Sequence, residues 1–311
     1  MMVSSDVVGA IGNTPMIRLR RVVPQGSAQV LAKLEFHNPT GSMKDRVAKA
    51  MVEAAASDGR LKPGGTVVEY TAGTTGISLA MVCAAKGYGS HMVFSDAFSQ
   101  EKRQTMQAFG AEITMVKSDN KKITEKLIKE MMDTAAKISQ KPNHWYSDQL
   151  NNKEAIAGYF SLGEEIWNQT GEKLHAFVQA VGTAHSIHGA TTALWKHNRA
   201  IHVAAVEPAE SAVLSGEPTG SHKIEGIGIG ILPPLWEPHL VNEIIKVRTE
   251  EAREMTRRLA REEGLFVGAS SGANVVAALR VAKRLAPDST VVTIMVDSGL
   301  RYLTTGLFGN I

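Results

Sequence analysis

The sequence has little that would indicate a secreted, membrane or nucleic-acid-binding protein. Its single cysteine, Cys83, excludes an intrachain disulfide and lies in an apolar helical run, where we expect a packed thiol. No apolar run reaches the length of a transmembrane helix, and residues 1–6 lack a basic start followed by an apolar core. The formal net charge of +3 is spread along the chain without a basic block. We therefore expect a cytoplasmic protein that binds neither membrane nor nucleic acid.

The order of apolar and polar residues indicates a two-domain α/β protein. At 311 residues, 43% of them hydrophobic and 21% charged, the chain is longer than one hydrophobic core usually supports. Short β-rich runs alternate with longer helical runs, which is typical of mainly parallel sheets with helices on both faces. We expect the crossing between domains in the polar stretch 139–153, which gives domains 1–150 and 151–311. The expected strands are 30–34, 66–70, 91–94, 112–116, 176–180, 201–206 and 290–296, and the expected helices are 76–86, 100–109, 124–138, 249–263, 271–285 and one from about 185.

A lysine stands where a predicted strand gives way to a predicted helix. Lys44 lies in the stretch 38–46, Asn-Pro-Thr-Gly-Ser-Met-Lys-Asp-Arg, between the strand at 30–34 and a helix that includes 47–52. Strand-to-helix junctions carry the active sites of many α/β proteins. A partly desolvated lysine amine that loses its proton there can attack a carbonyl carbon and form an imine. Lys44 is therefore the candidate catalytic residue.

Three further turns open predicted helices and are rich in small and hydroxyl residues. The turn 71–76, Thr-Ala-Gly-Thr-Thr-Gly, suits a carboxylate or phosphate because a helix N-terminus presents backbone N–H groups. The turn 182–186, Gly-Thr-Ala-His-Ser, is the better phosphate candidate. Ser270 stands before a third helix, where its hydroxyl can point into a pocket. Each turn taken alone is also compatible with a simple helix cap.

Two other patterns do not carry the function that they superficially indicate. The glycines of 226–230 are spaced like part of a dinucleotide-binding motif, but Pro233 and Pro234 stand where the phosphate-binding helix would run. We therefore reject nucleotide binding there. His185 and His188 are three apart on one predicted helix, yet no acidic or cysteine partner stands at ligand spacing, and zinc normally takes three or four protein ligands. We expect no metal.

In their order and spacing, these segments resemble the cysteine synthase and cystathionine β-synthase family of fold-type II pyridoxal phosphate enzymes. The resemblance covers nearly the whole chain. It implies two domains like those of tryptophan synthase β, each a mainly parallel twisted sheet flanked by helices, with about the first 35 residues crossing to the second domain. It also implies a homodimer that acts on small amino-acid substrates. Further motifs that carry the resemblance lie at 11–16, 147–152, 165–171, 222–228 and 299–305.

The resemblance implies a role for each candidate residue. Lys44 would hold pyridoxal 5′-phosphate as an imine and later take the α-proton of the substrate. Ser270 would face the pyridine nitrogen of the cofactor, and the loop 71–75 would bind the substrate carboxylate with help from Gln149. The implied cofactor-binding residues are Lys44, Thr74, Gly182, Thr183, Ala184, His185, Ser186 and Ser270, and the implied substrate-binding residues are Thr71, Ala72, Gly73, Thr74, Thr75, Gln149 and Gly226.

The implied reaction is β-replacement on an activated L-serine, such as O-acetyl-L-serine, through an α-aminoacrylate that sulfide or another nucleophile attacks. A neutral hydroxyl from Ser270 at the ring nitrogen makes the cofactor a weaker electron sink than a carboxylate would, which favours loss of a leaving group from Cβ. Two alternatives stay open. One is β-elimination, as in a serine dehydratase or a cysteine desulfhydrase, and the other is a non-catalytic regulatory protein that binds pyridoxal phosphate.

Four residues depart from the loops of the family. Ala72 and Thr74 replace the serine and asparagine of Thr-Ser-Gly-Asn-Thr-Gly, and each lost contact of this kind costs about 1 kcal/mol. Ala184 and His185 replace two glycines of the phosphate loop, so they need ordinary helical dihedral angles or carry strain. His185 is also able to reach the phosphate as an added cation. Because backbone donors at a helix N-terminus do not require glycine, we still expect cofactor binding.

Overall fold

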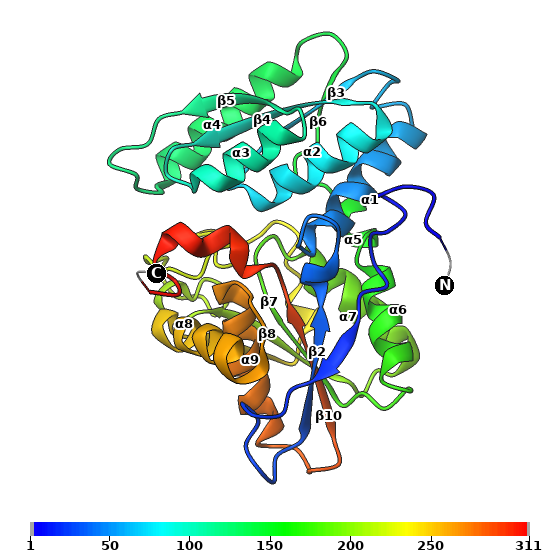
Figure 1. The fold of residues 1–311 in the computed structure, drawn as a ribbon, viewed down its shortest axis with the longest axis vertical. Helices are drawn as coiled ribbons and strands as arrows, with labels where there is room; N and C mark the ends of the chain where they lie inside the picture. The colour runs from blue at the N-terminus through cyan, green and yellow to red at the C-terminus, as the bar shows by residue number, and fades with distance from the viewer. Residues whose placement is uncertain (1–2, 310–311) are drawn as a thin grey trace. The chain divides into compact units, whose positions relative to one another are not determined.

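The computed structural model describes residues 3–309, which form two compact units, each with its own sheet (Figure 1). The first unit contains the residues up to Ile11 together with Asn38–Gly158. The second contains Gly12–His37 and the residues from Tyr159 onward. In the described part of the chain, no helix has the length and apolar composition that crossing a membrane requires.

The first unit is built on a fully parallel sheet of four strands. In the order in which they pair, they are β5 (Glu112–Val116), β4 (Gly89–Ser95), β3 (Thr66–Tyr70) and β6 (His144–Tyr146). Parallel neighbours cannot be joined by a tight turn, so long connections with helices link them. The helices are α1 (Lys44–Ser57), α2 (Thr74–Lys86), α3 (Gln100–Ala108), α4 (Glu125–Ser139) and α5 (Glu154–Ala157). Figure 1 shows α4 on one face of the sheet and α2 with α3 on the other.

Apolar residues at helical spacing bury α4 against this sheet. Leu127, Met131 and Ala135 belong to the same buried cluster as Val68 of β3. The helix begins after Thr124, whose side chain accepts a hydrogen bond of 3.2 Å from the N–H of Leu127. Because β3 and β6 are parallel neighbours, their carboxyl ends and the loops that follow them lie at one edge of the sheet.

The second unit is built on a sheet of six strands. In pairing order they are β1 (Met16–Arg18), β2 (Gln29–Leu34), β10 (Thr290–Met295), β7 (Ala176–Ala180), β8 (His202–Pro208) and β9 (Glu243–Val247). Only the pairing of β1 with β2 is antiparallel. The longer helices are α6 (Phe160–Gln169), α7 (His185–His197), α8 (Thr249–Arg258) and α9 (Ala269–Ala282), with a π-helical segment η4 (Leu259–Glu263) after α8. Short 3-10 segments are η1 (Glu35–His37), η2 (Ala209–Ser211), η3 (Pro238–Leu240) and η5 (Gly299–Thr305).

A buried ion pair fixes β2 inside the second unit. The amine of Lys33 is fully buried and lies 2.6 Å from the carboxylate of Glu165. It also donates to the carbonyl of Thr14 (2.6 Å) and to Oε1 of Gln169 (2.9 Å). Because a buried charge is tolerated only when its hydrogen bonds are made, these oxygens are needed to hold the lysine in place. They also hold the segment that leads into β1.

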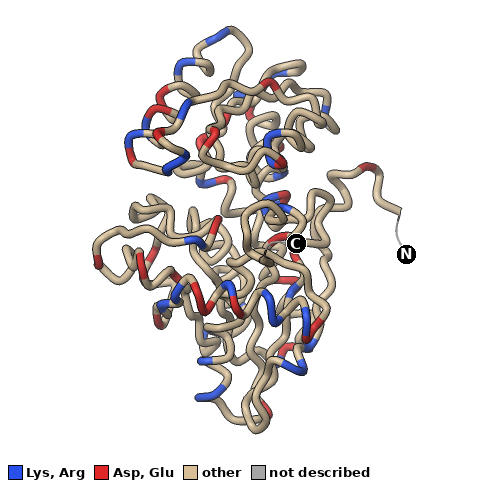
Figure 2. Tube along the Cα trace, turned by 60° about the vertical axis from the view of Figure 1, so that its left-hand side comes forward, with Lys and Arg blue, Asp and Glu red and all other residues tan. Residues whose placement is uncertain are grey.

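Charges of both signs are interspersed along each unit (Figure 2). Several form pairs on the surface, such as Arg258 with Glu262 at 2.7 Å and Arg284 with Glu243. Exposed pairs contribute only about 0–1 kcal/mol each, so the fold depends on the buried sheets rather than on these pairs.

The alternation of strands and helices agrees with the prediction, with some differences. The helix predicted from 76 begins at Thr74, and the helix predicted for 249–263 changes from α to π geometry after Arg258. The strands β1, β6 and β9 and the helices α5 and α6 were not predicted. The strand β6 lies in the polar stretch 139–153, where its three residues pair with β3 although their flanks carry no apolar periodicity.

Candidate active site

The turn before α1 is held by side chains as well as by backbone. The N–H of Gly41, which has a φ of 78°, donates to the carbonyl of Asn38 at 2.7 Å. The buried carboxylate of Asp45 accepts from both the N–H (2.8 Å) and the hydroxyl (2.5 Å) of Thr40. Lys44 is the first residue of α1 and is half-buried. The predicted catalytic amine therefore starts from a backbone that is fixed on both sides.

Thr71 organises the predicted carboxylate loop at the end of β3. Its buried hydroxyl oxygen accepts from the N–H groups of Gly73 (2.9 Å) and Gly76 (3.1 Å). Gly73 has a φ of 123°, and a Cβ there would lie 2.4 Å from a side-chain carbon of Lys102, so only glycine fits. Because α2 begins at Thr74, the N–H groups of residues 74 and 75 belong to the first helical turn and have no acceptor within the helix. This arrangement suits a carboxylate.

Gln149 follows β6 and therefore reaches the same edge of the sheet as Thr71. Its side-chain amide donates to the carbonyl of Tyr70 at 3.1 Å, and its N–H donates to Oε2 of Glu69 at 2.9 Å. The hydroxyl of Ser147 donates to the same carboxyl oxygen at 2.6 Å. The structure thus brings Gln149 and the loop 71–75 together at adjacent strand ends.

Glu69 is a residue of this site that the sequence analysis missed. It is fully buried, and its other oxygen, Oε1, has no hydrogen-bond partner among the described residues. Burial raises the pKa of this carboxyl to about 8, although the hydrogen bonds from Ser147 and Gln149 act in the opposite direction. A charged residue in the otherwise uncharged strand Thr-Val-Val-Glu-Tyr was the available signal.

The predicted phosphate loop connects β7 to α7 in the second unit. A Cβ on Gly182 would lie 2.4 Å from the carbonyl oxygen of Gly226, so the loop requires glycine at this position. Ala184, just before α7, has a φ of 68°. This is the left-handed conformation, which costs a non-glycine residue roughly 1–2 kcal/mol. The side chain of His185 is buried, and its Nδ1 lies 2.7 Å from the hydroxyl of Thr183.

A second glycine-rich loop packs against the phosphate loop. The N–H of Gly228 donates to the carbonyl of Val181 at 3.1 Å, which places Gly226 beside Gly182. Gly226, Gly228 and Gly230 all have positive φ values, and irregular backbone rather than a helix follows them. That no nucleotide binds at this loop stays a prediction.

Ser270 lies in the first turn of α9 and is buried. The next residue, Ser271, accepts a hydrogen bond of 2.9 Å from the N–H of Val296, which directly follows β10. Since β10 and β7 are parallel neighbours, Ser270 and the phosphate loop lie at the same edge of the sheet. The candidate residues therefore form two groups: 44, 71–75 and 149 in the first unit, and 182–186, 226 and 270 in the second.

The donor set of the second group fits the phosphate of pyridoxal phosphate. The loop 182–186 offers the hydroxyls of Thr183 and Ser186 and the first N–H groups of α7, and it contains no acidic side chain that would repel an anion. Ser270 adds a hydroxyl at the start of α9, which fits a neutral partner for a ring nitrogen.

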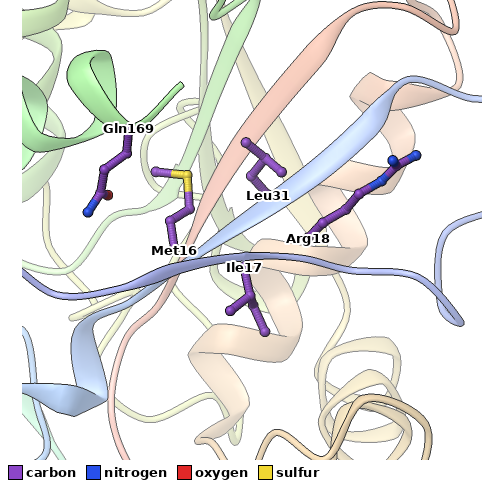
Figure 3. Close-up of a pocket in the computed structure, with 5 residues that line it drawn as sticks. All are labelled: Met16, Ile17, Arg18, Leu31 and Gln169. Atoms are coloured by element: carbon purple, nitrogen blue, oxygen red, sulfur yellow. The ribbon is translucent and has the colours of Figure 1, made fainter. Parts of the chain in front are cut away.

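An open depression of about 310 Å³ lies elsewhere in the second unit, beside the edge strand β1 (Figure 3). Met16 and Gln169 lie on one side of the strand, whereas Ile17 points to the opposite side. The hydrogen bonds of Gln169 to Lys33 and Thr14 occupy its amide. None of the predicted site residues lines this depression, and we assign it no chemistry.

Comparison with known proteins identifies the family to which the chain belongs. Residues 7–297 match the family model described as pyridoxal-phosphate-dependent enzyme. The chain is 39% identical over 305 residues to a cysteine synthase of Staphylococcus aureus, with 97% of this chain and 96% of that protein covered. It is 41% identical over 308 residues to a probable cysteine synthase of Bacillus subtilis, with coverage of 98% and 97%. The crystal structure of a cysteine synthase from Entamoeba histolytica superposes with a TM-score of 0.92 at 34% identity, and covers 99% of this chain and 91% of that one. The chain therefore belongs to the pyridoxal-phosphate-dependent enzyme family, within its cysteine synthase and cystathionine β-synthase group.

Proposed function

We propose that the protein catalyses β-replacement on an activated L-serine, such as O-acetyl-L-serine, with sulfide or another sulfur nucleophile. The observation that carries the proposal is Lys44 at the start of α1, on a turn that Asp45 and Thr40 hold in place. The similarity to cysteine synthases over nearly the full chain supports the same reaction.

In this proposal, different residues bind the substrate carboxylate and transfer the proton. Pyridoxal phosphate supplies an electron-withdrawing ring that makes the α-proton of a bound amino acid acidic. The amine of Lys44 would hold the cofactor, and the same amine would serve as the base that takes the proton from Cα of the substrate. The first-turn N–H groups of α2 and the amide of Gln149 bind the substrate carboxylate and orient Cα toward this amine.

The second unit supplies the residues that hold the cofactor. Gly182, Thr183 and Ser186 bind the phosphate at the start of α7. Ser270 would be the partner of the pyridine nitrogen, and because a hydroxyl is neutral it would leave the ring less protonated than a carboxylate would. Such a ring favours expulsion of a leaving group from Cβ over long-lived negative charge at Cα.

The altered carboxylate loop tunes substrate choice in this proposal. The side-chain hydroxyl of Thr71 keeps the loop geometry by accepting from the N–H groups of Gly73 and Gly76. In contrast, Ala72 lacks a hydroxyl and Thr74 lacks an amide. A lost hydrogen bond costs about 1 kcal/mol, which corresponds to roughly fivefold in affinity for a substrate that uses it. We therefore expect a preference among O-activated serines that differs from that of relatives with the usual loop.

Visible absorption of the purified protein tests the proposal. The band of lysine-bound cofactor should change when O-acetyl-L-serine is added without sulfide, and it should return when sulfide is added, with cysteine as the product. Return without sulfide, together with pyruvate release, would identify an elimination enzyme instead. A cofactor band that responds to none of the O-activated serines would contradict both reactions and favour a regulatory protein.

We also propose, from the family resemblance, that two copies form a homodimer and that the enzyme works in the cytoplasm. Light scattering coupled to size-exclusion chromatography should give twice the mass of the 33.4 kDa chain. A mass of one chain at micromolar concentration would contradict the dimer. Fractionation of cells that carry a tagged copy would test the location.

A further inference from the structure

Three buried neutral side chains form a continuous hydrogen-bond chain behind the phosphate loop. Ser186 lies in the first turn of α7, Gln179 lies on β7, and Asn274 lies on α9. The amide nitrogen of Gln179 donates to Oγ of Ser186 at 3.1 Å, and Nδ2 of Asn274 donates to Oε1 of Gln179 at 3.0 Å. Gln179 and Asn274 are 1% and 0% exposed, so protein atoms rather than bulk water must satisfy their amides.

Two backbone groups determine the direction of this chain. Oδ1 of Asn274 lies 2.7 Å from the N–H of Ala180, which can only donate, and Nδ2 lies 2.8 Å from the carbonyl of Ile294, which can only accept. The amide of Asn274 therefore has one possible orientation. Its Nδ2 donates to Oε1 of Gln179, so the nitrogen of Gln179 must face Ser186.

This direction has a consequence for the hydroxyl of Ser186. A side-chain amide nitrogen cannot accept a hydrogen bond, so Ser186 uses its oxygen toward Gln179 and its own proton must go to another acceptor. Ser186 lies in the first turn of α7, where backbone N–H groups also lack acceptors within the helix. The hydroxyl of Ser186 and the first N–H groups of α7 are therefore all hydrogen-bond donors at the start of this helix.

We propose that Gln179 and Asn274 are positioning residues of the cofactor site, which orient the hydroxyl of Ser186 as a donor to the phosphate of pyridoxal phosphate. The inference rests on the proposed function and deepens it. Asn274 also stands one helical turn after Ser270, so the same helix that presents a hydroxyl to the ring nitrogen anchors the phosphate donor.

This role explains how the phosphate loop can bind an anion although Ala184 and His185, which stand where the family has glycines, make its backbone less flexible. Ala184 has a left-handed backbone conformation, and the hydroxyl of Thr183 is hydrogen-bonded to the ring of His185. The loop therefore has little freedom to adapt around an anion. A hydroxyl that is oriented in advance does not have to be ordered when phosphate binds.

Equilibrium binding of pyridoxal 5′-phosphate and of pyridoxal, which lacks the phosphate, tests the proposal in the absence of substrate. Both aldehydes can react with Lys44, but only the first uses Ser186. The dissociation constants of Gln179→Met, Ser186→Ala and the double variant are measured by dialysis and absorption. We expect each single variant to weaken binding of pyridoxal phosphate about tenfold and to change binding of pyridoxal less than twofold.

The double variant separates a positioning role from an independent one. If Gln179 acts through Ser186, the double variant binds pyridoxal phosphate no more weakly than Ser186→Ala. Additive losses, or equal losses for the two aldehydes, would overturn the proposal. Thr191→Val is the matched control, because Thr191 is buried on α7 and its hydroxyl has no hydrogen-bond partner among the described residues. It should leave both dissociation constants unchanged.

A second variant covers the case in which Gln179→Met does not fold. Gln179→Asn keeps an amide in the core, but it is one carbon too short to reach both neighbours, and we expect the same selective loss. The ³¹P chemical shift of the bound phosphate should move in this variant and in Ser186→Ala but not in Thr191→Val. If the wild type binds the two aldehydes equally, the proposed phosphate site itself fails. If the wild type prefers the phosphate form and the variants keep that preference, only the positioning role fails.

Discussion

The buried carboxyl of Glu69 should make the first unit less stable as the pH rises. Its pKa is raised from 4.5 to about 8 in the folded protein, mainly by burial. Below pH 4.5 the folded and unfolded chains both carry the proton, and above about pH 8 both have lost it. Between these values only the folded chain keeps it, so the unfolded state binds fewer protons and the free energy of unfolding falls with increasing pH.

The size of this decrease in the free energy of unfolding follows from the width of the interval between the two pKa values. Each pH unit across it changes the free energy of unfolding by about 1.4 kcal/mol, so the whole interval corresponds to about 5 kcal/mol. This is a ceiling, because local opening of the segment 147–149 gives a charged Glu69 another route to water. Glu69→Gln should abolish the effect, since its amide oxygen accepts from Ser147 and Gln149 as the neutral acid does and carries no charge at any pH.

Urea unfolding between pH 5 and pH 9 measures the effect, with hydrogen exchange of the β3 and β6 peptides to locate it in the first unit. The stability of Glu69→Gln relative to the wild type should grow by several kcal/mol from pH 5 to pH 8 and then level off. Glu130→Gln, which changes an exposed glutamate on α4, should follow the wild type. Parallel pH profiles for the wild type and Glu69→Gln would refute the reasoning.

Other changes test the remaining parts of the site. Lys44→Ala should remove the absorption band of lysine-bound cofactor and nearly all turnover, and a variant with wild-type turnover would contradict its assignment as the catalytic amine. Gly182→Ala should weaken binding of pyridoxal phosphate and lower stability by roughly 1–3 kcal/mol, because its Cβ would lie 2.4 Å from the carbonyl oxygen of Gly226. Ala184→Gly should raise the free energy of unfolding by about 1 kcal/mol in urea titrations, since it relieves a φ of 68°; an unchanged or lower value would mean that the left-handed conformation is not strained.

Local patterns in the chain were sufficient to predict much of the fold and the junction at which Lys44 stands. Strands such as 66–70 and 112–116 are short β-rich runs bounded by polar turns, and the structure places β3 and β5 at those residues. Lys44 was predicted from its junction between a strand and a helix, which the structure contains. The short strand β6 was missed because three residues carry too little periodicity to distinguish a strand from a loop.

The roles of Glu69, Gln179 and Asn274 depend on contacts between residues far apart in the sequence, which no local pattern encodes. Glu69 becomes a partner of Gln149 only because β3 and β6 pair in parallel, and burial in that sheet is what raises its pKa. Gln179 meets Asn274 across 95 positions of sequence because α9 packs beside the end of β7. Periodicity reports which face of an element is buried, whereas the partner that a buried polar group finds is set by strand order and helix packing. The position of Lys44 between a strand and a helix could therefore be predicted along the chain, whereas the neighbours that surround the candidate site were decided only by the tertiary structure.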